Sequence, residues 1–363
     1  MVGLKRPEKW IAMTETKPSK IRLENALDAA LIRFQEVMNV PFPVMPELEV
    51  LESEPQFIAY ARPVGDGVLI QVSDGVVGAV DQLWSDALND ELMGSAVIDL
   101  DVDKDTLIDL SLQWLMHHEM EHWNMGHFGI NGGAALAETA SSLSHALVRQ
   151  VESKPVLMNE LSGYERGLAP LCLELQADHD ATEMVLGPYD PESWDQVRIH
   201  AAAIFSMLVL IELQDRGSET EDREKGPPTH PKAATRIFMM LGHVAEMWSI
   251  PARQEARNRN EASASEADLP SDEETESYTR QVVTPVFMDA LKLAAAGGAE
   301  HVVRELGAID DVIADIHRAQ TAAHSDIDGF KTEGAREWAT LWPVNGPVLK
   351  LLGLEGLDTN FRD

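Results

Sequence analysis

The chain has 363 residues, 44% of them hydrophobic and 25% charged, a composition typical of globular proteins and not of fibrous or wholly disordered ones. Its 61 acidic and 29 basic residues give a formal net charge of −32, which repels nucleic-acid phosphates and anionic lipid surfaces. We therefore expect no nucleic acid and no membrane as principal partners, and the length suggests one large domain or two smaller ones.

The sequence also predicts the cellular compartment. Residues 1–20 are charged and lack the apolar core of a signal peptide. The most apolar run, Ala201–Leu213, is about 13 residues long, which is too short to span a bilayer and suits a buried core helix. The single cysteine, Cys172, excludes an internal disulfide. We expect a cytoplasmic protein in which Cys172 is a small buried hydrophobic residue.

The N-terminal part predicts a helix followed by a small sheet. Apolar residues recur at helical spacing over 21–38, which predicts an amphipathic helix. Three short runs rich in β-forming residues follow, at 48–51, 57–60 and 67–72. The last run comes directly after a Gly-Asp-Gly turn, so we expect a hairpin there. Ser73 or Asp74 can then cap a helix that runs towards Leu88.

From Asp105 onward the hydrophobic pattern is helical. An apolar stripe that includes Leu107 and Trp114 leads into a histidine-rich segment, and we expect one continuous helix from about Asp105 to Phe128. Further helices are predicted at 134–151, 168–186, 193–214 and 231–248.

Hydrophobic periodicity is lost between 251 and 281, where the sequence is acidic, small and polar. This composition predicts a flexible linker. Residues 282–363 regain amphipathic helical patterns, for example over 286–293 and 302–317. We therefore expect a first domain at 1–250, a linker at 251–281 and a C-terminal helical region at 282–363.

The chemistry is concentrated in the motif His118-Glu119-x-x-His122. Helix positions i and i+4 lie on one face, so both imidazoles can reach one metal ion. Glu119 stands beside the first of these ligands and can reach a metal-bound water. Zinc suits such a set because it favours imidazole nitrogen and leaves a position for water.

A third ligand is expected from a second predicted helix, which carries Glu174 and Asp178 at the same i, i+4 spacing. A carboxylate from Glu174 would complete a His₂Glu site. Asp178 would then accept a hydrogen bond from the free ring N–H of a ligating histidine. His179 and Asp180 are weaker candidate ligands, and a solvated acidic helix face is the alternative interpretation.

Three segments together resemble one family. They are HEMEHWNMGH at 118–127, ELQAD at 174–178 and THPKAATRI at 229–237, in that order. In this respect the chain resembles the M48-type gluzincin metallopeptidases, and especially the soluble Lit-like phage-exclusion peptidases, over roughly residues 45–245. The resemblance implies a mainly helical (α+β) zincin-like fold with a small β-sheet beside the HExxH helix. It also implies that His230 approaches the substrate carbonyl.

Some residues depart from this pattern. Glu121 occupies a position that is usually small and uncharged in such helices, and we expect its side chain to face solvent. His117 is about 100° around the helix from His118 and is expected beside the site or at the surface. His127 does not fit the spacing of a metzincin third histidine, so we do not expect it to be a ligand.

Together these features predict a zinc-dependent endopeptidase with one Zn²⁺ per chain and a protein or peptide as substrate. His118, His122 and Glu174 bind the metal, Asp178 supports them, and Glu119 is the general base. The substrate is expected to lie along a sheet edge near Val68–Val72. There are two alternatives. The protein could be a non-catalytic binding protein of zincin fold or a metal-dependent hydrolase of a non-peptide substrate.

Overall fold

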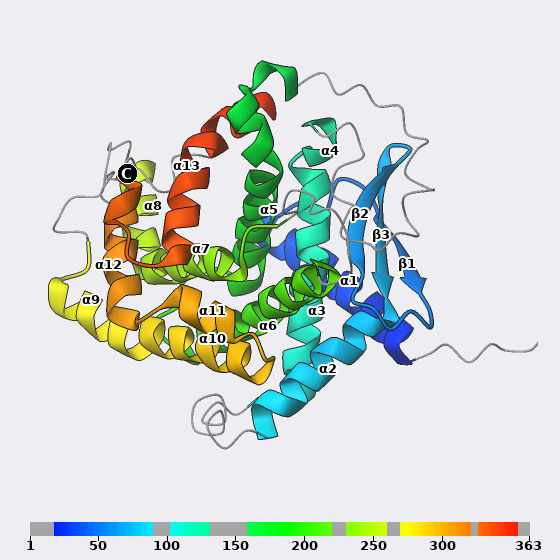
Figure 1. Ribbon diagram of the computed structural model, residues 1–363, viewed down its shortest axis with the longest axis horizontal. Coiled ribbons are helices and arrows are strands. Elements are labelled where there is room, and N and C mark those ends of the chain that lie inside the picture. The colour runs from blue at the N-terminus through cyan, green and yellow to red at the C-terminus, as the bar shows by residue number, and fades with distance from the viewer. Residues whose placement is uncertain are drawn as a thin grey trace, which may run out of the picture.

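The computed structural model describes residues 18–89, 102–130, 158–219, 230–259, 269–320 and 326–354. Within those ranges the chain is mainly helical, with a small mixed sheet on one side and the C-terminal helices on the other (Figure 1). This confirms the fold class predicted from the sequence. The predicted helix at 134–151 lies outside the described residues.

The sheet has three strands, β1 (Glu47–Leu51), β2 (Ala59–Val64) and β3 (Gly67–Ser73), in the order β1-β3-β2. β2 and β3 form the expected antiparallel hairpin, and β1 pairs in parallel with the other side of β3. Gly65 has a φ of +57° in the connecting turn, a conformation that glycine adopts at no steric cost.

The central position of β3 corrects one prediction. Residues Leu69–Val72 are paired on both sides, so this strand offers no free edge to a substrate. Its nearly continuous burial is typical of a central strand. The edge strand that packs against the motif helix is β2.

The motif helix α3 (Lys104–Asn124) is central to the fold. It packs against α1 (Pro18–Met38), α5 (Gly163–Leu186), α6 (Trp194–Glu219) and β2. Every side chain from Trp114 to His122 is buried. A helix that is buried on all sides must place its polar groups against polar partners, and the candidate site supplies those partners.

α3 ends earlier than we expected from the sequence. Asp103 caps its N-terminus by accepting a hydrogen bond of 2.8 Å from the Thr106 amide. At the other end Gly126 has a φ of +75°, which terminates the helix after Asn124. The prediction of a continuous helix to Phe128 was therefore wrong. A short helix, α4 (His127–Ile130), starts directly after the turn.

The neighbouring helices follow the predictions more closely. α2 (Asp74–Asn89) follows β3 directly, and α5 begins before the expected residue 168 because Ser162 and Glu165 form a capping box. α7 (Ala233–Glu246) begins after Pro231, and the Glu212 carboxylate accepts its first amide at 2.8 Å.

Helix α6 is long and apolar enough to cross a membrane by length and composition alone. Its segment Trp194–Arg216 has 23 residues and a mean hydropathy of 1.5, with 72% of the apolar window buried inside the fold. Core helices of globular proteins pass the same test, so this is weak evidence for a membrane span.

Much of the described part of 251–281 is helical, while residues 260–268 of the predicted linker lie outside the described residues. The described part contains α8 (Ile250–Asn258), α9 (Asp272–Tyr278) and the start of a π-helical turn that leads into α10 (Thr284–Ala296). The Tyr278 ring is 2% exposed and its hydroxyl donates to the Val244 carbonyl at 2.9 Å. One buried aromatic therefore fixes a segment whose average composition predicts disorder.

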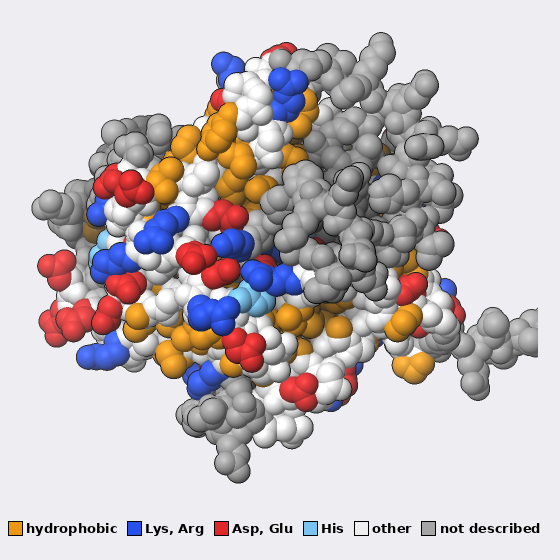
Figure 2. Space-filling model, viewed as in Figure 1, with side chains coloured by type: hydrophobic (Ala, Val, Ile, Leu, Met, Phe, Trp, Pro, Cys, Tyr) orange, Lys and Arg blue, Asp and Glu red, His pale blue; other side chains and the backbone are white. Residues whose placement is uncertain are grey.

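The C-terminal helices share the main hydrophobic core. α10 packs on α6, while α11 (Glu300–Leu306), α12 (Ile309–Gln320) and α13 (Glu333–Leu351) pack around α7, and α13 also packs on α5. Despite the net charge, Lys and Arg side chains lie among Asp and Glu on the face in Figure 2. Lys232, for example, pairs with Glu333 at 3.0 Å.

The contact between α13 and α7 is close enough to require glycine. A Cβ added at Gly334 would lie 2.5 Å from the backbone oxygen of Ala234. Real Cβ atoms do not approach backbone atoms so closely, so α13 could not dock in this position with a larger residue.

Replacing Gly334 by alanine tests this docking. The added methyl overlaps backbone, so we expect Gly334→Ala to lower the free energy of unfolding by roughly 1–3 kcal/mol. Gly242 of α7 is the matched control, because its added Cβ meets nothing within 4 Å. Gly242→Ala should be neutral or stabilise by up to about 1 kcal/mol. Urea unfolding measures both, and equal stabilities would contradict the close approach.

Candidate metal centre

The motif histidines and Glu174 meet where α3 packs on α5. The Nε2 atoms of His118 and His122 lie 3.2 Å apart. Oε2 of Glu174 lies 3.4 Å from His118 Nε2, and Oε1 lies 3.7 Å from His122 Nε2. All three side chains are buried, and their ligand atoms are mutually close enough to hold one metal ion. We call these three residues the triad.

The donor set fits a metal ion. Oε2 of Glu174 is buried and has no hydrogen-bond partner, which is costly for a carboxylate unless a cation satisfies it. Burial lowers the pKa of His118, but Asp178 and Glu174 outweigh it and raise that pKa to about 10. The triad therefore attracts positive charge, and two imidazoles with one carboxylate are ligands that zinc accepts.

Asp178 lies directly behind His118. Its Oδ1 is 3.0 Å from His118 Nδ1, and its two oxygens accept hydrogen bonds of 2.6 Å from Nε and Nη2 of Arg236. With a metal ion on Nε2 of His118, the ring proton would stay on Nδ1, where the Asp178 carboxylate faces it. Arg236 belonged to the family motif, but the sequence alone gave it no role.

His122 is oriented by residues that sequence reasoning missed. Its Nδ1 lies 2.9 Å from Nδ1 of His127, whose Nε2 lies 3.2 Å from Oε1 of Gln176. Nε2 of Gln176 donates to Oδ1 of Asn345 at 2.6 Å. Since Gln176 Oε1 accepts only, His127 donates from Nε2 and accepts at Nδ1. His122 therefore carries its proton on Nδ1 and presents a bare Nε2 to the triad.

Glu119 stands beside the triad without joining it. It is 5% exposed and borders a cavity of about 30 Å³ that His118 and His230 also line. Burial raises the pKa of Glu119 to about 7, although the charges of His118 and His230 oppose this rise. A carboxyl group with a pKa near neutrality can both accept and release a proton.

His230 reaches the same cavity from the segment before α7. Its Nε2 lies 3.4 Å from Oε2 of Glu174, and its Nδ1 lies 3.0 Å from Oδ2 of Asp215. Burial lowers the pKa of His230, but the charges of Glu174 and Asp215 outweigh it and raise that pKa above its ordinary value. The structure thus brings His230 and all the motif residues to one place.

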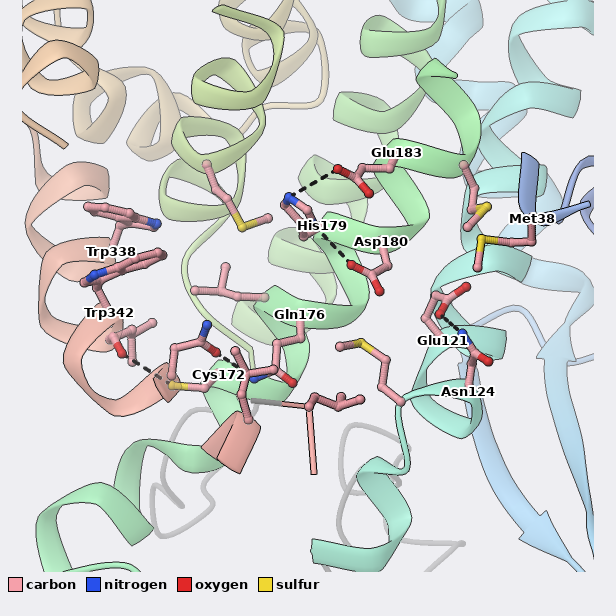
Figure 3. Close-up of a pocket in the computed structure, with 18 residues that line it drawn as sticks. Met38, Glu121, Asn124, Cys172, Gln176, His179, Asp180, Glu183, Trp338 and Trp342 are labelled. Atoms are coloured by element: carbon pink, nitrogen blue, oxygen red, sulfur yellow. Dashed lines mark hydrogen bonds and ion pairs between the residues drawn. The ribbon is translucent and has the colours of Figure 1, made fainter. Parts of the chain in front are cut away.

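The expectation for Glu121 was wrong, and that for His117 is narrowed, because burial excludes its surface alternative. Glu121 is fully buried and lines a second, larger cavity, where its Oε2 accepts a hydrogen bond of 2.8 Å from Asn124 (Figure 3). It faces neither solvent nor the triad. His117 is also fully buried, and burial lowers its pKa to about 3. It is a neutral core residue and not a surface one.

Comparisons with known proteins add no assignment: no family model matches the chain, and no match was found among curated proteins or solved structures. What the structure does show is a buried His118/His122/Glu174 group with the arrangement of an HExxH…E metal site.

Breaking the chain of hydrogen bonds behind His122 tests its role. Gln176→Leu removes the acceptor for His127, so we expect zinc affinity at the triad to fall by roughly 10–100-fold. Leu349→Met is the matched control, because it changes the wall of the same cavity without touching the chain of hydrogen bonds. Isothermal titration of the metal-free protein gives both affinities. Unchanged binding in Gln176→Leu would show that His122 needs no such support.

Proposed function

We propose that the protein is a zinc-dependent hydrolase that cleaves peptide bonds, with one Zn²⁺ at the triad. The observation that carries this proposal is the position of Glu119, which is buried next to three metal-ligating side chains but is not one of them. A structural zinc site needs no such free carboxylate, and a hydrolytic one does. The resemblance to gluzincin peptidases points to the same activity.

The residues at the triad and beside it have different roles in this proposal. His118, His122 and Glu174 would hold the metal, which when bound supplies Lewis acidity towards a carbonyl group and a water molecule. Glu119 takes the proton from the attacking water and later delivers it to the leaving amine. Its pKa of about 7 suits both transfers.

His230 is suited to stabilising charge on the substrate. Asp215 holds its Nδ1 at 3.0 Å, which directs Nε2 towards Glu174 and the cavity. The charges of Glu174 and Asp215 outweigh burial and raise the pKa of His230, which favours the protonated ring. We propose that this N–H donates to the carbonyl oxygen as negative charge develops there.

A peptide substrate would approach along β2. This strand is an edge of the sheet, it packs against α3, and its residue Ala59 lines the cavity of Glu119. An extended peptide can add to such an edge through backbone hydrogen bonds. A protein or peptide partner in the cytoplasm also agrees with a charge that disfavours nucleic acids and membranes.

Exchanging Glu119 separates catalysis from metal binding. Glu119→Gln keeps the shape but removes the base, so we expect zinc content to be retained and peptide cleavage to fall by roughly 10²-fold or more. His118→Ala/His122→Ala should lose both zinc at the triad and activity, because the ligands are gone. Cleavage of a fluorogenic peptide library and metal analysis provide the two readouts.

The exposed Glu192→Gln is the matched control and should behave as the wild type. Wild-type turnover by Glu119→Gln would exclude Glu119 as the base. If the zinc-loaded wild type cleaved no peptide in the library while hydrolysing a small ester or amide, the non-peptide alternative would replace the proposal.

A further inference from the structure

A cavity larger than that of Glu119 lies on the other side of α5 from the triad. It has a volume of about 330 Å³ and is bounded by α5, α7, α13 and the C-terminal end of α3 (Figure 3). Trp338 and Trp342 form one apolar wall. On the α5 side of the cavity, His179 lies between Asp180 and Glu183.

A second group of metal-ligating atoms stands at this cavity. Nε2 of His179 lies 3.8 Å from Oε1 of Glu183, and Nδ1 of His243 lies 3.9 Å from the same oxygen. The two imidazole rings are 5.5 Å apart and at 89° to each other. All three ligand atoms fall within 4.8 Å. We propose that His179, Glu183 and His243 form a second site for a divalent transition-metal ion such as Zn²⁺.

The arrangement repeats that of the triad. In both groups, two ligands lie four positions apart on one helix and the third comes from a helix packed against it. In both, Nδ1 of a histidine lies 3.0 Å from an aspartate oxygen, His118 with Asp178 and His179 with Asp180. With a metal ion on Nε2 of His179, the ring proton would stay on Nδ1, which faces Asp180.

The negative charge around His179 and the imidazole ligands indicate which ion the second site would bind. Asp180 and Glu183 stand beside His179 as two carboxylates. A dication reduces the mutual repulsion of these groups. Two imidazoles favour zinc and similar metals over Ca²⁺ and Mg²⁺, which take oxygen ligands.

The second site lies at the edge of the cavity. His179 and Glu183 line the cavity, and three protein ligands leave a zinc ion with an open fourth position. A small molecule with a metal-binding head group could therefore ligate the ion while its apolar part contacts Trp338 and Trp342. This site does not depend on the proposed peptidase activity.

Zinc titration of the full-length, metal-free protein tests the proposal. We expect His179→Ala/His243→Ala to bind one zinc ion fewer than the wild type and to retain the ion at the triad. His118→Ala/His122→Ala should lose the other ion and keep this one. His200→Ala, a histidine of α6 outside both groups, is the control and should bind as the wild type. Elemental analysis after dialysis gives the stoichiometry independently of activity.

A second variant covers the case in which the double variant does not fold. Asp180→Asn keeps the three ligands but loses the anionic acceptor for His179, so it should weaken zinc binding at this site by roughly 10–100-fold and leave the triad unchanged. If neither His179→Ala/His243→Ala nor Asp180→Asn alters the number or affinity of bound zinc ions, the second site does not exist.

Discussion

The structure depends on how charge is buried where α3, α5 and α7 meet. Asp178 and Arg236 are each 1% exposed, and they are joined by two hydrogen bonds of 2.6 Å. A buried charge is costly unless it is paired and hydrogen-bonded. α5 and α7 therefore cannot slide past each other without leaving a charge uncompensated. The same carboxylate faces Nδ1 of His118, so the constraint that fixes the helix packing also orients a metal ligand.

Local spacing accounts for the part of the site that could be predicted. His118 with His122, and Glu174 with Asp178, are pairs four positions apart, and helical geometry alone puts each pair on one face. Periodicity does not say which two faces meet. That step came from the resemblance to a family motif, and the observed distances between Glu174 and the two histidines agree with it.

The rest depends on contacts between distant parts of the chain. Gln176 and Asn345 are 169 positions apart, so no local pattern links Asn345 to His122. Glu121 was expected at the surface because acidic side chains are rarely fully buried, yet packing of α3 on all sides leaves it no route to solvent. The helix that contains Tyr278 could not be predicted from composition either. The buried ring and its hydrogen bond to Val244 hold this segment in place despite the polar residues around it.

Gln176 is part of the chain of hydrogen bonds behind His122. Gln176 and its partner Asn345 also line the large cavity. A molecule in that cavity that hydrogen-bonds to either amide competes with the bond between them. Through His127, such competition would change how strongly Nε2 of His122 attracts a cation. Binding free energies are reciprocal, so an occupant of the cavity and a cation at the triad that were coupled in this way would alter each other's affinity by the same factor. The amide pair would then be the link between the two compartments.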